Sequence, residues 1–283
     1  MSRWIDRGKR ALEIYRENNV SVYAGNATLF MVTAAAPFLM LIIAIVNLLP
    51  GYSPKDVTAV FFQLLPNLDS IRGLVESMVA NLKSQSGGLL ASVSALTTLW
   101  SASKGVSAIQ KGLNQLNQVE ETSKIRGLLK QLVFTLTLVV LFPALLVFEM
   151  LGDSIEGILF GALEKLDPKG LEAMEEGIRS FFHISALVVA LLAFLVILQI
   201  YAKLPASQKS LKSQIPGALL TGVGWYAFTR LFAFFIPRFY HASSLYGSLA
   251  SLFLVLLWLR FVIMILFAGE ALNLAVEEDK ANQ

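Results

Sequence analysis

Cysteine is absent from this 283-residue chain, and histidine occurs only twice, as His183 and His241. The first absence excludes disulfide bonds and thiolate metal sites, and the second leaves few imidazoles for a metal cluster. Charged residues are also scarce, at 15% of the chain, whereas an average soluble domain has about 25%. Chemistry that needs Cys or His clusters is therefore not expected, and the charge is too low to cover a water-facing surface.

Apolar residues are abundant instead, at 55% of the chain, and the mean hydropathy is +0.64. They form runs near the 20 or so residues with which a helix crosses about 30 Å of hydrocarbon. The sequence therefore predicts an all-α polytopic membrane protein, a bundle of about six transmembrane helices in one membrane domain over residues 1–283. The predicted spans are about 20–49, 87–109, 128–152, 180–203, 213–237 and 245–272.

The segments outside these spans have their own patterns. Residues 1–19 predict a basic amphipathic helix at the membrane surface, because apolar residues recur at helical spacing among arginines and lysines. This segment lacks the apolar core of a removable signal peptide. Two apolar stripes at 57–65 and 71–82 predict short amphipathic helices on the extracytoplasmic face. Residues 273–283 form a predicted cytoplasmic tail.

Lysine and arginine are unevenly distributed around the predicted spans. The N-terminal segment, the C-terminal tail and the loops after the second and fourth spans contain twice as many as the other loops. The loop after the third span is acidic instead. By the positive-inside rule both termini are cytoplasmic, which requires an even number of spans and is consistent with six in a bacterial inner membrane.

Five ionisable residues fall within or at the ends of the predicted spans: Lys104, Glu149, Arg230, Arg260 and Glu270. A charge in hydrocarbon is costly, so each is expected to have a partner or a purpose. We expect Glu149 to pair with Arg230, and Glu270 to pair with either Lys104 or Arg260. These residues are either clamps between helices or the lining of a polar, partly hydrated cavity.

The fifth predicted span is the weakest, because Arg230 alone costs about 3 kcal/mol at the centre of a helix. It is also rich in small residues. Gly217, Ala218, Thr221 and Gly222 form two overlapping small-xxx-small pairs, which predict close helix packing. The alternative is an interrupted helix whose freed backbone lines a substrate site.

Sequence signatures of enzymes are missing. Neither histidine has neighbours at metal-ligand spacing, and there is no GxSxG elbow or phosphate-binding glycine loop. The chain is therefore expected to be no enzyme and to need no cofactor or metal ion. Its basic segments are explained by topology, so the expected partners are the lipid bilayer and a small-molecule substrate, with no nucleic acid.

Three stretches resemble one family. They are VYAGNATLFMVTAAAPFLMLIIAI at 22–45, LWSASKGVSAIQKGLNQ at 99–115, and SLYGSLASLFLVLLWLRFVIMILFAGEALN at 244–273, the last preceded by Tyr201, Pro205, Pro216, Gly217 and Ala218. Together they are similar to the YihY/BrkB family. The resemblance implies a bacterial inner-membrane protein of about six helices, from a family once mislabelled ribonuclease BN. Some members are linked to virulence, and solute export has been proposed. The chain departs from the family pattern at Arg260 and at Gly-Glu-Ala-Leu-Asn, where Gly-Ala-Glu-Leu is usual.

Three functions are compatible with these observations. The leading hypothesis is a transporter or exporter of a small anionic or amphipathic solute. The second is an envelope scaffold that binds a membrane partner through the amphipathic segments of 57–82. The third is a membrane-bound hydrolase or nuclease, which would depend on scattered carboxylates such as Glu149 and Glu270.

Overall fold

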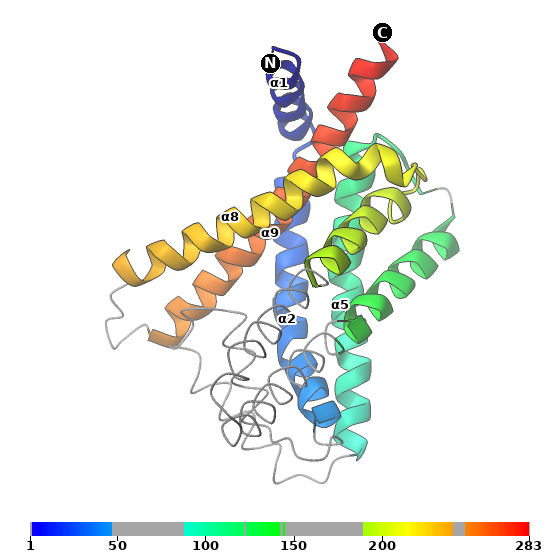
Figure 1. Cartoon of the computed structure of the whole chain (residues 1–283). Coiled ribbons are helices and arrows are strands. Elements are labelled where there is room, and N and C mark those ends of the chain that lie inside the picture. The colour runs from blue at the N-terminus through cyan, green and yellow to red at the C-terminus, as the bar shows by residue number, and fades with distance from the viewer. Residues whose placement is uncertain are drawn as a thin grey trace, which may run out of the picture.

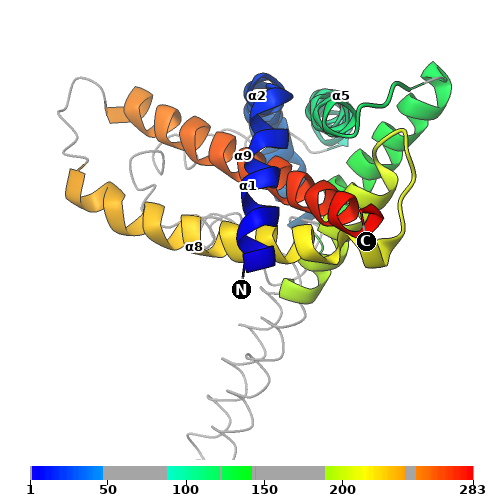
Figure 2. The ribbon, with the colours of Figure 1, turned by 90° about the horizontal axis from the view of Figure 1, so that it is seen from above.

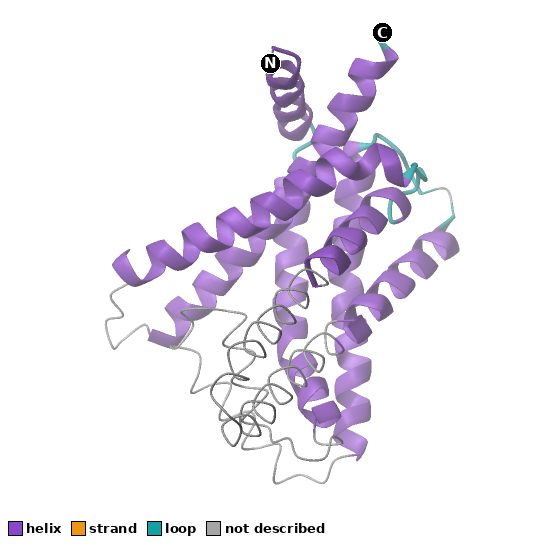
Figure 3. Ribbon diagram, in the orientation of Figure 1, coloured by secondary structure: helices purple, strands orange, loops and turns teal. Residues whose placement is uncertain are grey.

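A computed structural model describes residues 2–46, 88–121, 123–141, 144, 189–239 and 247–282, which contain helices and no strand (Figure 3). The predicted all-α class is confirmed for these residues. Five helices carry labels in Figure 1: α1 (Ser2–Glu17), α2 (Ser21–Val46), α5 (Gly88–Leu116), α8 (Ile215–Phe239) and α9 (Gly247–Ala281). Two further α-helices cover 124–141 and Val189–Lys203, and the short 3-10 helix η1 (Leu211–Gln214) leads into α8.

Each of the six predicted spans overlaps one of these helices. Two helices are longer than predicted, since α5 continues to Leu116 and α9 continues to Ala281. Both extensions are polar, so apolar length alone could not reveal them. Glu149 and the predicted helices at 57–65 and 71–82 lie outside the described residues.

The two ends of the chain lie side by side, because α1 runs antiparallel to the last part of α9 (Figures 1 and 2). Arg7 Nη2 lies 2.6 Å from Asp279 Oδ2, and Arg10 Nε lies 2.7 Å from Glu278 Oε2. Ile14 is buried on the same face of α1. The other face exposes Ile5 and Leu12, and Trp4 is exposed beside Arg7. The amphipathic helix is therefore confirmed, whereas its place at a membrane surface stays a prediction.

The core forms where α9 meets α2, α5 and α8. α2 packs along α5, α8 packs along α9, and α9 also crosses α2. Phe267 of α9 is fully buried, and its ring occupies the space where a side chain at Gly112 of α5 would begin. Ala24 and Ala27 of α2 are buried in the same cluster. Small residues on α2 and α5 thus allow α9 to approach closely.

One end of the bundle holds both chain ends and the loops 117–121 and 204–210 (Figure 1). Side chains fix the second loop in place. Gln110 Nε2 donates to Leu204 O at 2.8 Å, and Lys130 Nζ donates to Pro205 O at 2.7 Å. Asn114 Oδ1 accepts the backbone N–H of Ala206 at 2.8 Å. The segments that the charge pattern assigns to one side of a membrane therefore share one end of the fold.

Large apolar side chains cover the outside of the described helices. On the 124–141 helix, Leu128, Leu132, Leu136 and Val140 form an exposed stripe at four-residue spacing. Two described segments are long and apolar enough to cross a membrane, Leu211–Phe235 and Phe253–Ala281, and Val189–Lys203 is a shorter apolar helix. Only 11% and 28% of the most apolar stretches of the two long segments are buried. A core helix of a soluble protein would hide these residues, so their exposure favours a lipid environment.

Candidate functional site

The described structure separates the predicted site residues. Lys104 on α5, Arg230 on α8 and Arg260 on α9 are exposed, whereas Glu270 on α9 is fully buried. Arg230 contacts Tyr226 one turn earlier, through a 3.3 Å hydrogen bond and a cation–π contact of 5.4 Å. Glu149, its predicted partner, is not described. The charged residues therefore do not surround a common cavity in the part of the chain that the structure describes.

Glu270 is the centre of a buried polar network. Its carboxylate accepts hydrogen bonds from Asn117 Nδ2 at 2.8 Å and from Asn273 Nδ2 at 3.1 Å. Lys209 Nζ lies 3.5 Å from Oε1 and forms the ion pair. The same ammonium lies 2.9 Å from Glu277, nearer the surface. A buried carboxylate needs this many partners, because removing it from water is otherwise costly.

The predicted pairing of Glu270 with Lys104 or Arg260 is therefore wrong. Arg260 precedes Glu270 by ten residues on α9, which is about 15 Å along a helix. Lys104 precedes the observed partner Asn117 by more than three turns of α5. The true partner, Lys209, lies in the loop 204–210, where the sequence marked it only as a cytoplasmic charge.

Asn273 connects this network to the contact between α8 and α9. Its Oδ1 accepts the backbone N–H of Gly217 at 2.6 Å, and its Nδ2 also donates to Gln214 Oε1 at 2.8 Å. A Cβ at Gly217 would collide with the carbonyl oxygen of Gly269 and with Asn273. Gly217 thus allows backbone-to-backbone contact, which confirms the packing role predicted from the small-residue spacing.

A second polar contact lies one turn deeper. The hydroxyl of Tyr201 donates to Leu266 O at 2.6 Å and lies 2.6 Å from Thr221 Oγ1. Both side chains are fully buried. These contacts join the Val189–Lys203 helix to α8 and α9, so the polar network clamps the helices at one end of the bundle.

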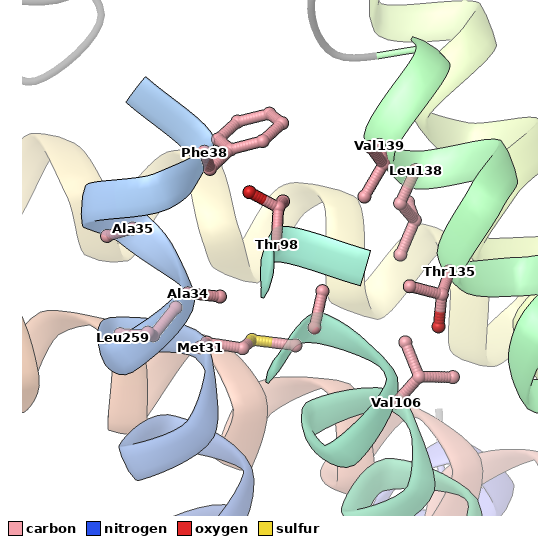
Figure 4. Close-up of a pocket in the computed structure, with 11 residues that line it drawn as sticks. Met31, Ala34, Ala35, Phe38, Thr98, Val106, Thr135, Leu138, Val139 and Leu259 are labelled. Atoms are coloured by element: carbon pink, nitrogen blue, oxygen red, sulfur yellow. The ribbon is translucent and has the colours of Figure 1, made fainter. Parts of the chain in front are cut away.

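An apolar cavity of about 340 Å³ lies further along the bundle, between α2, α5, the 124–141 helix and α9. Met31, Ala34 and Phe38 contribute to its wall from α2, and Val106 and Leu138 face them (Figure 4). None of Lys104, Arg230, Arg260 and Glu270 lines it. This apolar cavity is therefore not the polar cavity predicted around these charges, which stays a prediction.

Two threonines are the polar residues of the cavity wall. Thr135 Oγ1 donates to Gln131 O at 2.6 Å and is thereby satisfied. Thr98, which is 1% exposed, has a buried hydroxyl with no hydrogen-bond partner among the described residues. A buried hydroxyl without a partner costs about 1–3 kcal/mol. One unsatisfied polar group therefore belongs to the apolar wall, with its oxygen covered by neighbouring atoms.

Sequence reasoning missed Asn117, Lys209, Asn273 and Thr98. Only Asn273 had a usable signal, since it follows Glu270 by three residues and so lies on the same side of the helix. The others lie far from Glu270 or from each other in the sequence. Neutral side chains also attract no notice in a search for charges.

The described helices expose apolar side chains on their outer surface, as contact with lipid requires, and their polar contacts lie inside the bundle. These two features together define a helical membrane protein. The virulence factor BrkB family model matches residues 11–283, and the chain belongs to that family. The resemblance inferred from the sequence motifs is confirmed.

Several named proteins are similar over most of the chain. A ribonuclease-like protein of Bacillus subtilis, YfkH, is 28% identical over 89% of this chain and 88% of its own. A UPF0761 membrane protein of Haemophilus influenzae is 22% identical over 93% and 92%, and another of Mannheimia succiniciproducens is 22% identical over 92% and 85%. No solved structure matches the chain.

Proposed function

We propose that this chain is a six-span protein of the bacterial inner membrane, with both termini cytoplasmic, that transports a small amphipathic solute and catalyses no reaction. The observation that supports transport is the apolar cavity lined by four helices. Its volume of about 340 Å³ is at the lower end of the roughly 300–1,000 Å³ typical of ligand sites. A solute with a short apolar body and one polar group fits this size.

The chemistry of the wall narrows the solute further. Met31, Phe38 and Leu138 offer an apolar surface, which favours an apolar body. The Thr98 hydroxyl, without a partner in the described structure, would satisfy its hydrogen-bonding capacity on a polar atom of the solute. Because the four lining helices come from distant parts of the chain, a change in their packing would alter access to the cavity.

Transport is tested with proteoliposomes that contain the full-length chain and with radiolabelled octyl sulfate, a small amphiphile that stays ionised. We expect faster uptake than in protein-free liposomes. Ala102→Trp, which fills the cavity, should abolish the increase, whereas Ala227→Trp at an exposed position of α8 should not. Thr98→Val keeps the shape of the wall and should reduce uptake.

The transport proposal fails if uptake equals that of protein-free liposomes, or if Ala102→Trp transports as fast as Ala227→Trp. Elution of each variant as a single symmetric peak in size-exclusion chromatography controls for misfolding.

The topology is tested separately, because the chain has no cysteine of its own. Single cysteines replace the exposed residues Gln118, Gln208 and Asn282. We expect a membrane-impermeant maleimide to label none of them in intact spheroplasts and all of them after permeabilisation. Labelling of any of the three from outside would contradict the shared cytoplasmic placement.

The two alternatives have less support. The scaffold hypothesis depends on residues 57–82, which lie outside the described residues. A ribonuclease role comes only from the name of the Bacillus relative, and the described residues contain no group of three His, Cys, Asp or Glu side chains that could hold a metal ion.

A further inference from the structure

A second hollow, separate from the solute cavity, lies between the 124–141 helix and the Val189–Lys203 helix. This groove has a volume of about 310 Å³. Val133, Phe134 and Val196 line its apolar part, and Thr137, Gln199 and Lys203 also face it. The groove is thus mainly apolar, with polar groups from both helices.

Helical spacing places the groove and the cavity on different faces of the 124–141 helix. Val133, Phe134 and Thr137 face the groove, whereas Thr135 and Val139 face the cavity. Successive residues of a helix point about 100° apart, so these sets diverge, and Leu138 borders both hollows. A ligand in the groove would therefore be a different molecule from the transported solute.

Gln199 and Lys203 give the groove its polar end. They are one turn apart on the same face of an otherwise apolar helix, and both are exposed. Neither has a hydrogen bond or ion pair within the described residues. On a surface that meets lipid, an amide and an ammonium are costly unless a polar group contacts them. The groove therefore fits a ligand that has an apolar chain and an anionic group.

A polar hollow of about 550 Å³ lies at the loop end of the same helix. Arg126 and Lys130 line it, two turns and one turn before the groove residues Val133 and Phe134 on the same helix face. Ser207 also lines it and has a buried hydroxyl without a hydrogen-bond partner in the part of the chain that the structure describes. Glu120 and Glu121 also line this hollow, and their negative charges balance those of the two cations. A carboxylate oxygen of Glu121 lies 3.7 Å from Lys130 Nζ.

We infer that a glycerophospholipid binds along this helix pair, with an acyl chain in the groove and its phosphate against Lys203. The charge of the phosphate complements the free ammonium, and the amide of Gln199 offers a hydrogen bond. The rest of the headgroup extends toward Arg126 and Ser207. Cationic side chains between helices on the cytoplasmic side, where the proposed topology places this end of the bundle, are a usual setting for recognition of a lipid headgroup.

The test uses the purified full-length protein in detergent and native mass spectrometry. Dioleoyl phosphatidylglycerol and dioleoylglycerol are titrated in parallel, because they share acyl chains and differ in the phosphate-bearing headgroup. We expect one phosphatidylglycerol to bind at least about tenfold more tightly than dioleoylglycerol, as one charge-assisted hydrogen bond would provide. Lys203→Gln should remove most of this difference.

Two matched controls make the result specific. Lys212→Gln removes an exposed lysine of η1 that lines none of the three hollows, and should leave binding unchanged. Val133→Trp fills the groove and should block phosphatidylglycerol, whereas Leu132→Trp on the exposed stripe should not. Equal affinity for the two lipids, or equal loss in Lys203→Gln and Lys212→Gln, would overturn the assignment. Neither result affects the transport proposal, which depends on the cavity.

Discussion

Replacing Lys209 with methionine should destabilise the protein strongly, because it leaves the buried carboxylate of Glu270 without its cation. Breaking a buried ion pair from one side typically costs about 3–5 kcal/mol. Here Lys209 is 14% exposed and its ammonium is 3.5 Å from Glu270, while Asn117 and Asn273 still donate to the carboxylate. We therefore expect about 2–3 kcal/mol for Lys209→Met, below the usual range.

A double-mutant cycle isolates the pair. Glu270→Gln should cost about 1–2 kcal/mol, because its amide nitrogen would face a side-chain donor from Asn117 or Asn273 in place of a carboxylate oxygen. When both residues are replaced, no charge is left buried. The double variant should therefore be more stable than the two single losses predict, by about 1 kcal/mol or more.

Equilibrium unfolding of the purified protein in mixed micelles measures these free energies. Lys212→Met serves as the matched control, since Lys212 is an exposed lysine three residues later, and it should change stability by less than about 0.5 kcal/mol. The reasoning is refuted if Lys209→Met costs no more than Lys212→Met, or if the two replacements at 209 and 270 are additive.

Three further outcomes can be measured with the same preparation. Gly217→Ala should lower the free energy of unfolding by about 2 kcal/mol or more. Gly222→Ala, which meets no atom within 4 Å, should be neutral or stabilise by up to about 1 kcal/mol. Equal effects would contradict the close contact of α8 and α9. Arg7→Glu should make α1 more sensitive to limited proteolysis, and the added change Asp279→Arg should restore protection if the observed pair holds α1 on α9. Thr98→Val should raise the unfolding free energy by about 1 kcal/mol, because it removes a buried unsatisfied hydroxyl; a loss of stability would mean that the hydroxyl has a partner.

The positions of the helices could be predicted because each depends on a local run of apolar residues. The predicted 213–237 and the observed α8 at Ile215–Phe239 differ by only two residues at each end. Arg230 did not prevent this helix from forming, since its guanidinium is exposed and contacts Tyr226 on the same helix. Local spacing also gave the correct role for Gly217.

The partners of Glu270 could not be predicted in the same way. Lys209 is 61 positions away and Asn117 is 153 positions away, and no local rule connects such distances. Sequence reasoning sought a cation inside a predicted span, whereas the real one reaches in from a loop. The apolar cavity could not be predicted from the sequence either, because its wall combines one face from each of four helices.

The pairing of α1 with the end of α9 has a consequence for biosynthesis. Arg7 leaves the ribosome 272 residues before its partner Asp279. At about 5–20 residues per second, the first helix waits on the order of 10–50 s for its binding surface. Until then the apolar side of α1, including Ile14, must be covered by something else, such as lipid. The contact between α1 and α9 therefore forms only after the helices between them in the sequence have been made.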